Sequence, residues 1–173
     1  MRNTLRLAAP LALLLLAMPA TARERLPSNP QVDYAGFAAL TSDLAKVRRT
    51  HRLAWPQFAE RARAEGALLL DARSADAFAR GHLKGAVNLP FTDFTDEALA
   101  AVIGTNTRRP IYIYCNNNFS DHRAPIQLKR APMALNIPTF INLHGYGYRN
   151  VWELADVIGT NDAGVEWETA LGG

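Results

Sequence analysis

The sequence predicts an α/β domain in which a central parallel sheet carries helices on both faces. Two observations lead to this fold class. Short, wholly apolar runs, such as residues 67–70 and Ile111–Tyr114, are typical of strands that are buried on both faces. Segments with helical periodicity alternate with these runs along the chain, and such alternation favours a parallel sheet.

The first 22 residues have the features of a cleavable export signal. Arg2 and Arg6 precede an apolar run over residues 7–17, and Ala20-Thr21-Ala22 places small residues at a signal peptidase site. The run is shorter than the roughly 20 residues that a membrane span requires. We therefore expect cleavage near Ala22, export to the periplasm or beyond the cell, and no membrane span afterwards. An uncleaved membrane anchor is the alternative.

Cleavage would also change the charge balance of the chain. The full sequence has 19 Lys and Arg against 16 Asp and Glu. Loss of Arg2 and Arg6, with no acid among residues 1–22, leaves 17 basic residues against 16 acidic ones. The basic residues are scattered among acidic ones, which argues against a nucleic-acid partner. The mature length suits a single domain.

The elements before the first strand are a linker and two helices. Residues 23–31 are polar and rich in proline, which predicts a linker. An amphipathic helix is expected over residues 34–52, because apolar side chains recur every three or four positions: Tyr34, Phe37, Leu40, Leu44 and Val47. A second helix begins at Pro56 and ends near Gly66, just before the strand at 67–70.

The remaining elements continue the alternation. Ser74 caps a short helix that ends at Gly81, and a brief strand over 86–89 stops at Pro90. A helix over 94–103 leads to the strand Ile111–Tyr114, and the last strand is Val151–Leu154. These elements indicate an N-terminal linker and helix (23–49), one domain (50–160) and a C-terminal tail (161–173).

Cys115 is the only cysteine of the chain, so it cannot form an internal disulfide. It is either buried and inert, linked to another chain, or reactive. Its position favours reactivity, because it directly follows a strand, and ligands bind at the carboxyl ends of parallel strands. We expect loop amides, the start of the next helix, His122 and Arg123 to stabilise its thiolate and lower its pKa.

Two segments resemble the rhodanese-like domain family. The stretch from Leu70 to Pro90, LDARSADAFARGHLKGAVNLP, is similar to the family's Asp-x-Arg strand end, short helix, Gly-His-hydrophobe-x-Gly-Ala and second strand. The stretch from Pro110 to Cys115, PIYIYC, resembles the strand that delivers the family's catalytic cysteine into a loop. The likeness covers roughly residues 50–160.

The resemblance implies sulfur transfer without a cofactor. Cys115 would be the nucleophile that takes a sulfane sulfur from a small anionic donor such as thiosulfate, or from a polysulfide. A thiol, either of a small molecule or of a protein, would accept the sulfur. Arg123 would bind the anion, and backbone amides of the loop would hold the persulfide: Asn116, Asn117, Asn118, Phe119 and Ser120.

The loop after Cys115 departs from the family pattern, which leaves other functions open. Seven residues, NNNFSDH, separate Cys115 from Arg123; none is glycine, and Asp121 would repel an anion. A non-catalytic module that binds a protein partner is therefore one alternative. A phosphatase or arsenate reductase is another, although that chemistry resembles Cys-x5-Arg and this loop is Cys-x7-Arg.

Charged residues outside the loop have structural interpretations. We expect Asp71 to hold its own turn through backbone hydrogen bonds, and Arg73 to form an exposed pair with Asp76. No metal site is expected, because Cys115 and His122 are the only close pair of soft ligands and their spacing matches no zinc pattern.

Overall fold

The computed structural model describes residues 29–121 and 124–169. The strands are β1 (Arg52–Leu53), β2 (Leu68–Asp71), β3 (His82–Leu83), β4 (Val87–Asn88), β5 (Ile111–Tyr114), β6 (Val151–Leu154) and β7 (Trp167–Glu168). The α-helices are α1 (Tyr34–Thr50), α2 (Trp55–Ala62), α3 (Ala75–Arg80), α4 (Asp96–Ile103) and α5 (Asn136–Gly145). Three 3-10 helices, η1 (Phe91–Asp93), η2 (Asn116–Asn118) and η3 (Ala131–Met133), lie between them.

Five strands form one sheet in the order β1-β6-β5-β2-β4, and every neighbouring pair in it is parallel. The expected α/β class with a central parallel sheet is therefore confirmed. The strands expected over 67–70, 86–89, 111–114 and 151–154 are present as β2, β4, β5 and β6. β2, β5 and β6 are adjacent, so their carboxyl ends meet at one edge of the sheet.

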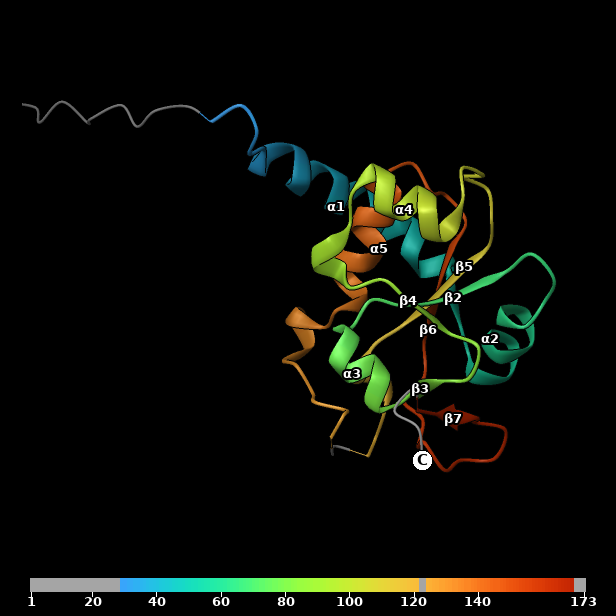
Figure 1. Cartoon of the computed structure of the whole chain (residues 1–173). Coiled ribbons are helices and arrows are strands. Elements are labelled where there is room, and N and C mark those ends of the chain that lie inside the picture. The colour runs from blue at the N-terminus through green and yellow to red at the C-terminus, as the bar shows by residue number, and fades with distance from the viewer. Residues whose placement is uncertain (1–28, 122–123, 170–173) are drawn as a thin grey trace, which may run out of the picture. The chain divides into compact units, whose positions relative to one another are not determined.

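The sheet separates two hydrophobic cores, and β5 contributes to both. Ile111 and Ile113 point into the core beneath α1, α4 and α5, whereas Tyr112 and Tyr114 point into the core that contains Phe58 of α2. Successive side chains of a strand point to opposite faces, so a strand covered on both sides is apolar throughout. Figure 1 shows α4 and α5 together on one side of the sheet, with α2 apart from them.

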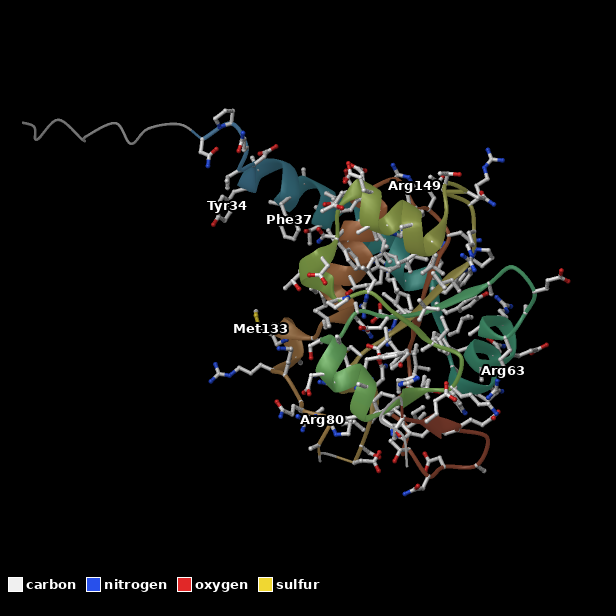
Figure 2. The ribbon with its side chains drawn as sticks, in the orientation of Figure 1. Tyr34, Phe37, Arg63, Arg80, Met133 and Arg149 are labelled. Carbon is white, nitrogen blue, oxygen red and sulfur yellow. The ribbon has the colours of Figure 1, made fainter. Side chains whose placement is uncertain are left out.

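Helix α1 is an integral part of the domain, although only its second half packs. Leu44 is buried against the core, and α1 contacts α5. The apolar stripe predicted the helix, but its first two members do not pack: Tyr34 is 84% exposed and Phe37 is 50% exposed (Figure 2). The compact unit begins at Asp33, ahead of the boundary at residue 50 that the sequence predicted.

The C-terminal segment also belongs to the fold. The region expected to be a tail contains β7, which pairs antiparallel with β3. Trp167 of β7 packs edge-on against Phe119 and lies so close to Gly81 that a Cβ there would meet its indole carbons at 2.7 Å. Gly81 is therefore required by the close approach of Trp167.

The predicted signal peptide, residues 1–22, lies outside the described residues. Within residues 29–121 and 124–169, no helix is both long and apolar enough to cross a membrane.

Candidate functional site

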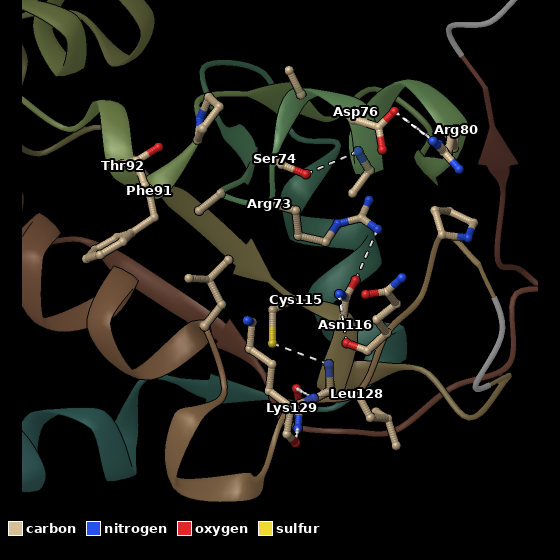
Figure 3. A pocket seen from close by; sticks show the side chains of 18 of the residues that line it. Arg73, Ser74, Asp76, Arg80, Phe91, Thr92, Cys115, Asn116, Leu128 and Lys129 are labelled. Carbon is tan, nitrogen blue, oxygen red and sulfur yellow. Dashed lines mark hydrogen bonds and ion pairs between the residues drawn. The ribbon is translucent and has the colours of Figure 1, made fainter.

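Cys115 lies where the sequence placed it, one residue beyond the carboxyl end of β5. A cavity of about 630 Å³ opens at this edge of the sheet, and Cys115 forms part of its wall. Figure 3 shows Arg73 and the start of α3 on one side of the cysteine, and Leu128 and Lys129 on another. The cavity lining comes from four parts of the chain, within residues 72–80, 90–93, 115–117 and 124–135.

The end of β2 carries a buried ion pair beside this cavity. Arg73 Nη2 lies 2.6 Å from Asp71 Oδ2, and both side chains are almost fully buried. Asp71 Oδ1 also accepts the backbone N–H of Arg73, so the expected turn role of Asp71 is confirmed. The expected partner of Arg73 was wrong: Asp76 pairs instead with Arg80, one helical turn further on. Asp71 is buried and Asp76 is exposed, so an unpaired charge would be far more costly at Asp71.

The ion pair connects several segments. Arg73 donates to the carbonyl of Gly81 and, at 3.2 Å, to Oδ1 of Asn116 in the loop after Cys115. Its guanidinium lies 5.7 Å from the ring centre of Tyr114 and 5.8 Å from that of Trp167. Burial alone would lower the pKa of Arg73, but its hydrogen bonds with Asp71 and the charge of that carboxylate raise it.

Tyr114 completes the cluster from β5. Its hydroxyl donates to Asp71 Oδ2 at 2.7 Å and accepts the backbone N–H of Leu83. Burial, followed by the negative charge of Asp71, raises the pKa of Tyr114 well above the ordinary range for a phenol. Tyr114 is therefore a neutral hydrogen-bond donor. The only sign of this role in the sequence is a polar atom at a strand position that is buried on both faces, and it did not predict a site residue.

The loop after Cys115 does not form the expected ring of amides. Asn117 donates its backbone N–H to Cys115 Sγ at 3.4 Å, but it is the only one of residues 116–120 found to do so. The N–H groups of Asn118, Phe119 and Ser120 donate to backbone carbonyls instead. Asn116–Asn118 fold into the 3-10 turn η2, which uses the N–H groups of Asn118 and Phe119, whereas the N–H of Ser120 donates to the carbonyl of Ile158.

The expected substrate-binding residues divide into three groups. Asn116 and Asn117 line the cavity beside Cys115, and their side-chain amides donate to the carbonyls of Gln127 and Lys129. Asn118 and Phe119 are buried behind the loop, so the structure does not place them against a substrate. Ser120 donates its backbone N–H to the carbonyl of Ile158 and does not line the cavity. Arg123 and His122 lie outside the described residues.

Asp121 does not line the cavity either. Its carboxylate accepts the backbone N–H of Thr160 at 2.8 Å and so joins the loop after β5 to the segment after β6. Asp121 therefore has a structural role in the loop, and its repulsion of an anionic donor stays a prediction.

The start of α5 supplies further donors to the thiol. The backbone groups of Leu135 and Asn136, where α5 begins, lower the pKa of the Cys115 thiol. The first N–H groups of a helix have no partner within the helix and favour negative charge. The expectation that the next helix would point its start at Cys115 is thus confirmed, although about twenty residues separate the two.

The expected low pKa of Cys115 was wrong. Only 1% of the residue is exposed, and this burial is the largest influence, raising the pKa of the thiol above its ordinary value. The N–H groups of Asn117, Asn136 and Leu135 lower the pKa, while the charge of Glu153 raises it. The sequence could not give this result, because the thiol is surrounded by residues distant in sequence, such as Leu135, Asn136 and Glu153.

The charges around the cavity nearly cancel. Its lining includes the cations of Arg73, Arg80 and Lys129 and the carboxylates of Asp76 and Asp93. Both arginines are held in ion pairs, which leaves Lys129 as the unpaired cation of the lining within the described chain. No group of three or more metal-binding side chains occurs in the region that the structure describes.

Comparison with known proteins identifies a family for most of this region. The family described as rhodanese-like domain matches residues 55–156. This match includes Cys115 and the strands on either side of β5, but leaves out α1, β1 and β7. No curated protein matches the chain.

Solved structures share the fold at low sequence identity. The BH2092 protein from Bacillus halodurans is 18% identical, with a TM-score of 0.51, over 78% of this chain and 87% of that one. The Alr3790 protein from Anabaena sp. is 16% identical, with a TM-score of 0.48, over 69% of this chain and 94% of that one. A rhodanese with anions from E. coli is 19% identical, with a TM-score of 0.39, over 60% and 98%. At these identities the likeness concerns the fold alone.

The ion pair of Arg73 and Asp71 generates a stability prediction. Arg73→Met leaves the Asp71 carboxylate buried without its partner, so the free energy of unfolding should fall by about 3 kcal/mol or more. Arg80→Met is the matched control, because it breaks an exposed pair with Asp76 and should change stability by about 0.5 kcal/mol or less. Urea unfolding measures both. Equal losses in the two variants would contradict the assigned importance of the buried pair.

The raised pKa of Cys115 predicts the pH dependence of its reactivity. In the native protein the thiolate is the minor form near neutral pH, so the alkylation rate should climb with pH and level off above the midpoint of a free thiol. The same chain in denaturant supplies the free-thiol midpoint for the same residue. A native midpoint at or below the denatured one would contradict the prediction.

Proposed function

The chain belongs to the rhodanese-like domain family, and from that premise we propose that it carries and transfers sulfane sulfur on Cys115. The observation that carries this proposal is the surroundings of the thiol. Cys115 lies at the wall of a cavity of about 630 Å³, the backbone N–H of Asn117 donates to its sulfur, and the backbone groups of Leu135 and Asn136 lower the pKa of the thiol. Such donors stabilise a thiolate or a terminal persulfide anion.

The loading step forms one sulfur–sulfur bond and breaks another. The Cys115 thiolate attacks the outer sulfur of the donor, and the donor's own bond to that sulfur breaks. Its electron pair leaves with the remainder, which is sulfite when the donor is thiosulfate and a shorter sulfide chain when it is a polysulfide. Cys115 then holds a persulfide.

The transfer step restores the cysteine. An acceptor thiolate attacks the outer sulfur of the persulfide, and the Cys115 thiolate departs with the electron pair. The cycle needs no external oxidant or reductant and no cofactor. Because burial raises the pKa of the Cys115 thiol, only a minority of molecules hold the reactive thiolate near neutral pH, and loading should be faster in alkaline solution.

The lining of the cavity favours a polysulfide, or a donor of similar size, over a compact dianion such as thiosulfate. Lys129 is the lining cation that no ion pair engages within the described residues, and two carboxylates share the same lining. Phe91, Leu128 and Leu135 add apolar surface to the cavity wall. A mixed lining of this kind suits an extended sulfur chain, whose charge is spread over several atoms, better than a compact dianion.

A protein-binding module without catalysis is the second candidate, and two observations favour it. Cys115 is almost fully buried, which limits access to a donor. Leu128, on the cavity rim, is 46% exposed, and Met133 nearby in sequence is 64% exposed and points outward (Figure 2). Exposed apolar side chains next to a cavity are typical of surfaces that bind proteins.

No observation favours a phosphatase or an arsenate reductase. Enzymes of that kind surround an oxyanion with successive free amides of the loop after the cysteine. Here the amides of Asn118, Phe119 and Ser120 are already used in backbone hydrogen bonds.

Sulfur loading tests the proposal directly. After incubation with polysulfide at alkaline pH, the intact mass of the protein should rise by one or more sulfur atoms and return to its starting value on reduction. Cys115→Ser is the control and should gain no sulfur, because the chain has no other cysteine. If the native protein gains nothing from polysulfide or thiosulfate while the denatured chain reacts, the binding module becomes the better account.

A further inference from the structure

Glu153 is a buried carboxylate in the middle of the sheet. It lies in β6 next to β5, and only 4% of its side chain is exposed. Its partner is Arg48 on α1, whose Nε and Nη2 donate to the two carboxylate oxygens at 2.6 and 2.7 Å. A paired geometry of this kind is the strongest way in which a protein holds a buried carboxylate. Arg48 lies outside the region that the family match covers.

A short chain of hydrogen bonds leads from Glu153 to Cys115. The amide group of Asn136 donates to Glu153 Oε1 at 3.3 Å and to Asn118 Oδ1 at 2.9 Å. The same oxygen of Asn118 accepts the backbone N–H of Cys115 at 3.0 Å. The backbone of Asn136 also lowers the pKa of the thiol. Glu153 therefore orients the residue that begins α5 and contacts the thiol.

We propose that Arg48 is a positioning residue for Cys115, acting through Glu153: it neutralises the buried carboxylate and fixes Asn136 and Asn118 against the cysteine. One consequence of this assignment, that α1 controls sulfur uptake, rests on the proposed function. The effect on the thiol itself does not require sulfur transfer.

Arg48 affects the thiol because, without it, the negative charge of Glu153 has no partner. A negative charge close to a thiol disfavours its ionisation, and the charge of Glu153 already raises the pKa of Cys115 with Arg48 in place. Without the guanidinium, the carboxylate is unpaired in a poorly screened interior and opposes the thiolate more strongly. Arg48 is 39% exposed at its side chain, so the compensating charge comes from the surface.

The other charged groups around Cys115 are either neutralised by a partner or left unchanged by the substitutions proposed below. Arg73 contacts the neighbouring Asn116 but is paired with Asp71. On α5, burial lowers the pKa of His144, which keeps it neutral near pH 7. The remaining charges of the surrounding elements lie at the strand end or in the cavity lining: Asp156, Asp76, Arg80, Asp93 and Lys129.

The test compares the alkylation rate of Cys115 at one pH below its midpoint. Arg48→Met should slow alkylation by about tenfold, which corresponds to a rise of about one unit in the pKa. Arg48→Lys keeps the charge and should stay close to the parent. Arg49→Met is the matched control, because Arg49 is the next residue of α1, is exposed, and makes no contact with Glu153; its rate should not change.

The Glu153→Gln background separates positioning from simple destabilisation. Glu153→Gln should react faster than the parent, because the opposing charge is gone while Arg48 remains. In that background, Arg48→Met should no longer slow the reaction below the parent rate. A variant that merely loosens α1 would expose the buried thiol and speed alkylation. The proposal is overturned if Arg48→Met matches the parent, or if it slows alkylation equally with glutamate and with glutamine at position 153. Persulfide loading, measured separately, decides the proposed function independently.

Discussion

A buried ion pair at the end of β2 holds this edge of the sheet together. Arg73 and Asp71 neutralise each other where little water can reach them, and nearly every donor and acceptor of the pair is used. Through these bonds β2 is joined to β5 by Tyr114 and to the loop after Cys115 by Asn116. Because a buried charge without a partner is costly, these segments have one favourable arrangement, and the cavity beside Cys115 has a defined wall.

Around the thiol, burial and hydrogen bonding oppose each other. Burial of Cys115 disfavours the thiolate, whereas the backbone groups of Asn117 and of the start of α5 favour it. Burial prevails, so the resting cysteine is protonated. A persulfide is more acidic than a thiol and extends one atom further from the chain. The same donors would therefore stabilise the loaded state more than the resting state, which suits a residue that stores sulfur.

The sequence predicted the central strands because each is short and wholly apolar, which burial on both faces requires. It placed Cys115 correctly, since that residue directly follows such a strand. Two-residue strands such as β3 and β7 carry no pattern, so the position of Trp167 beside Gly81 could not be predicted. The predicted ring of amides around Cys115 does not form, because Asn116–Asn118 fold into a 3-10 turn. Contacts between residues distant in sequence decide the protonation of the thiol, and no local spacing records them.

The central claim is that Cys115 passes sulfur on, and loading alone would not establish this, since an exposed thiol can also be persulfidated. The most direct measurement is a single turnover. Protein loaded with sulfur and freed of donor is mixed with a small thiol, and both products are followed by mass spectrometry. The protein should lose its extra sulfur at the rate at which the thiol gains it, and faster than the same chain does in denaturant. A native persulfide that persists in the presence of the thiol, or that decays without a sulfur-bearing product, would contradict the account.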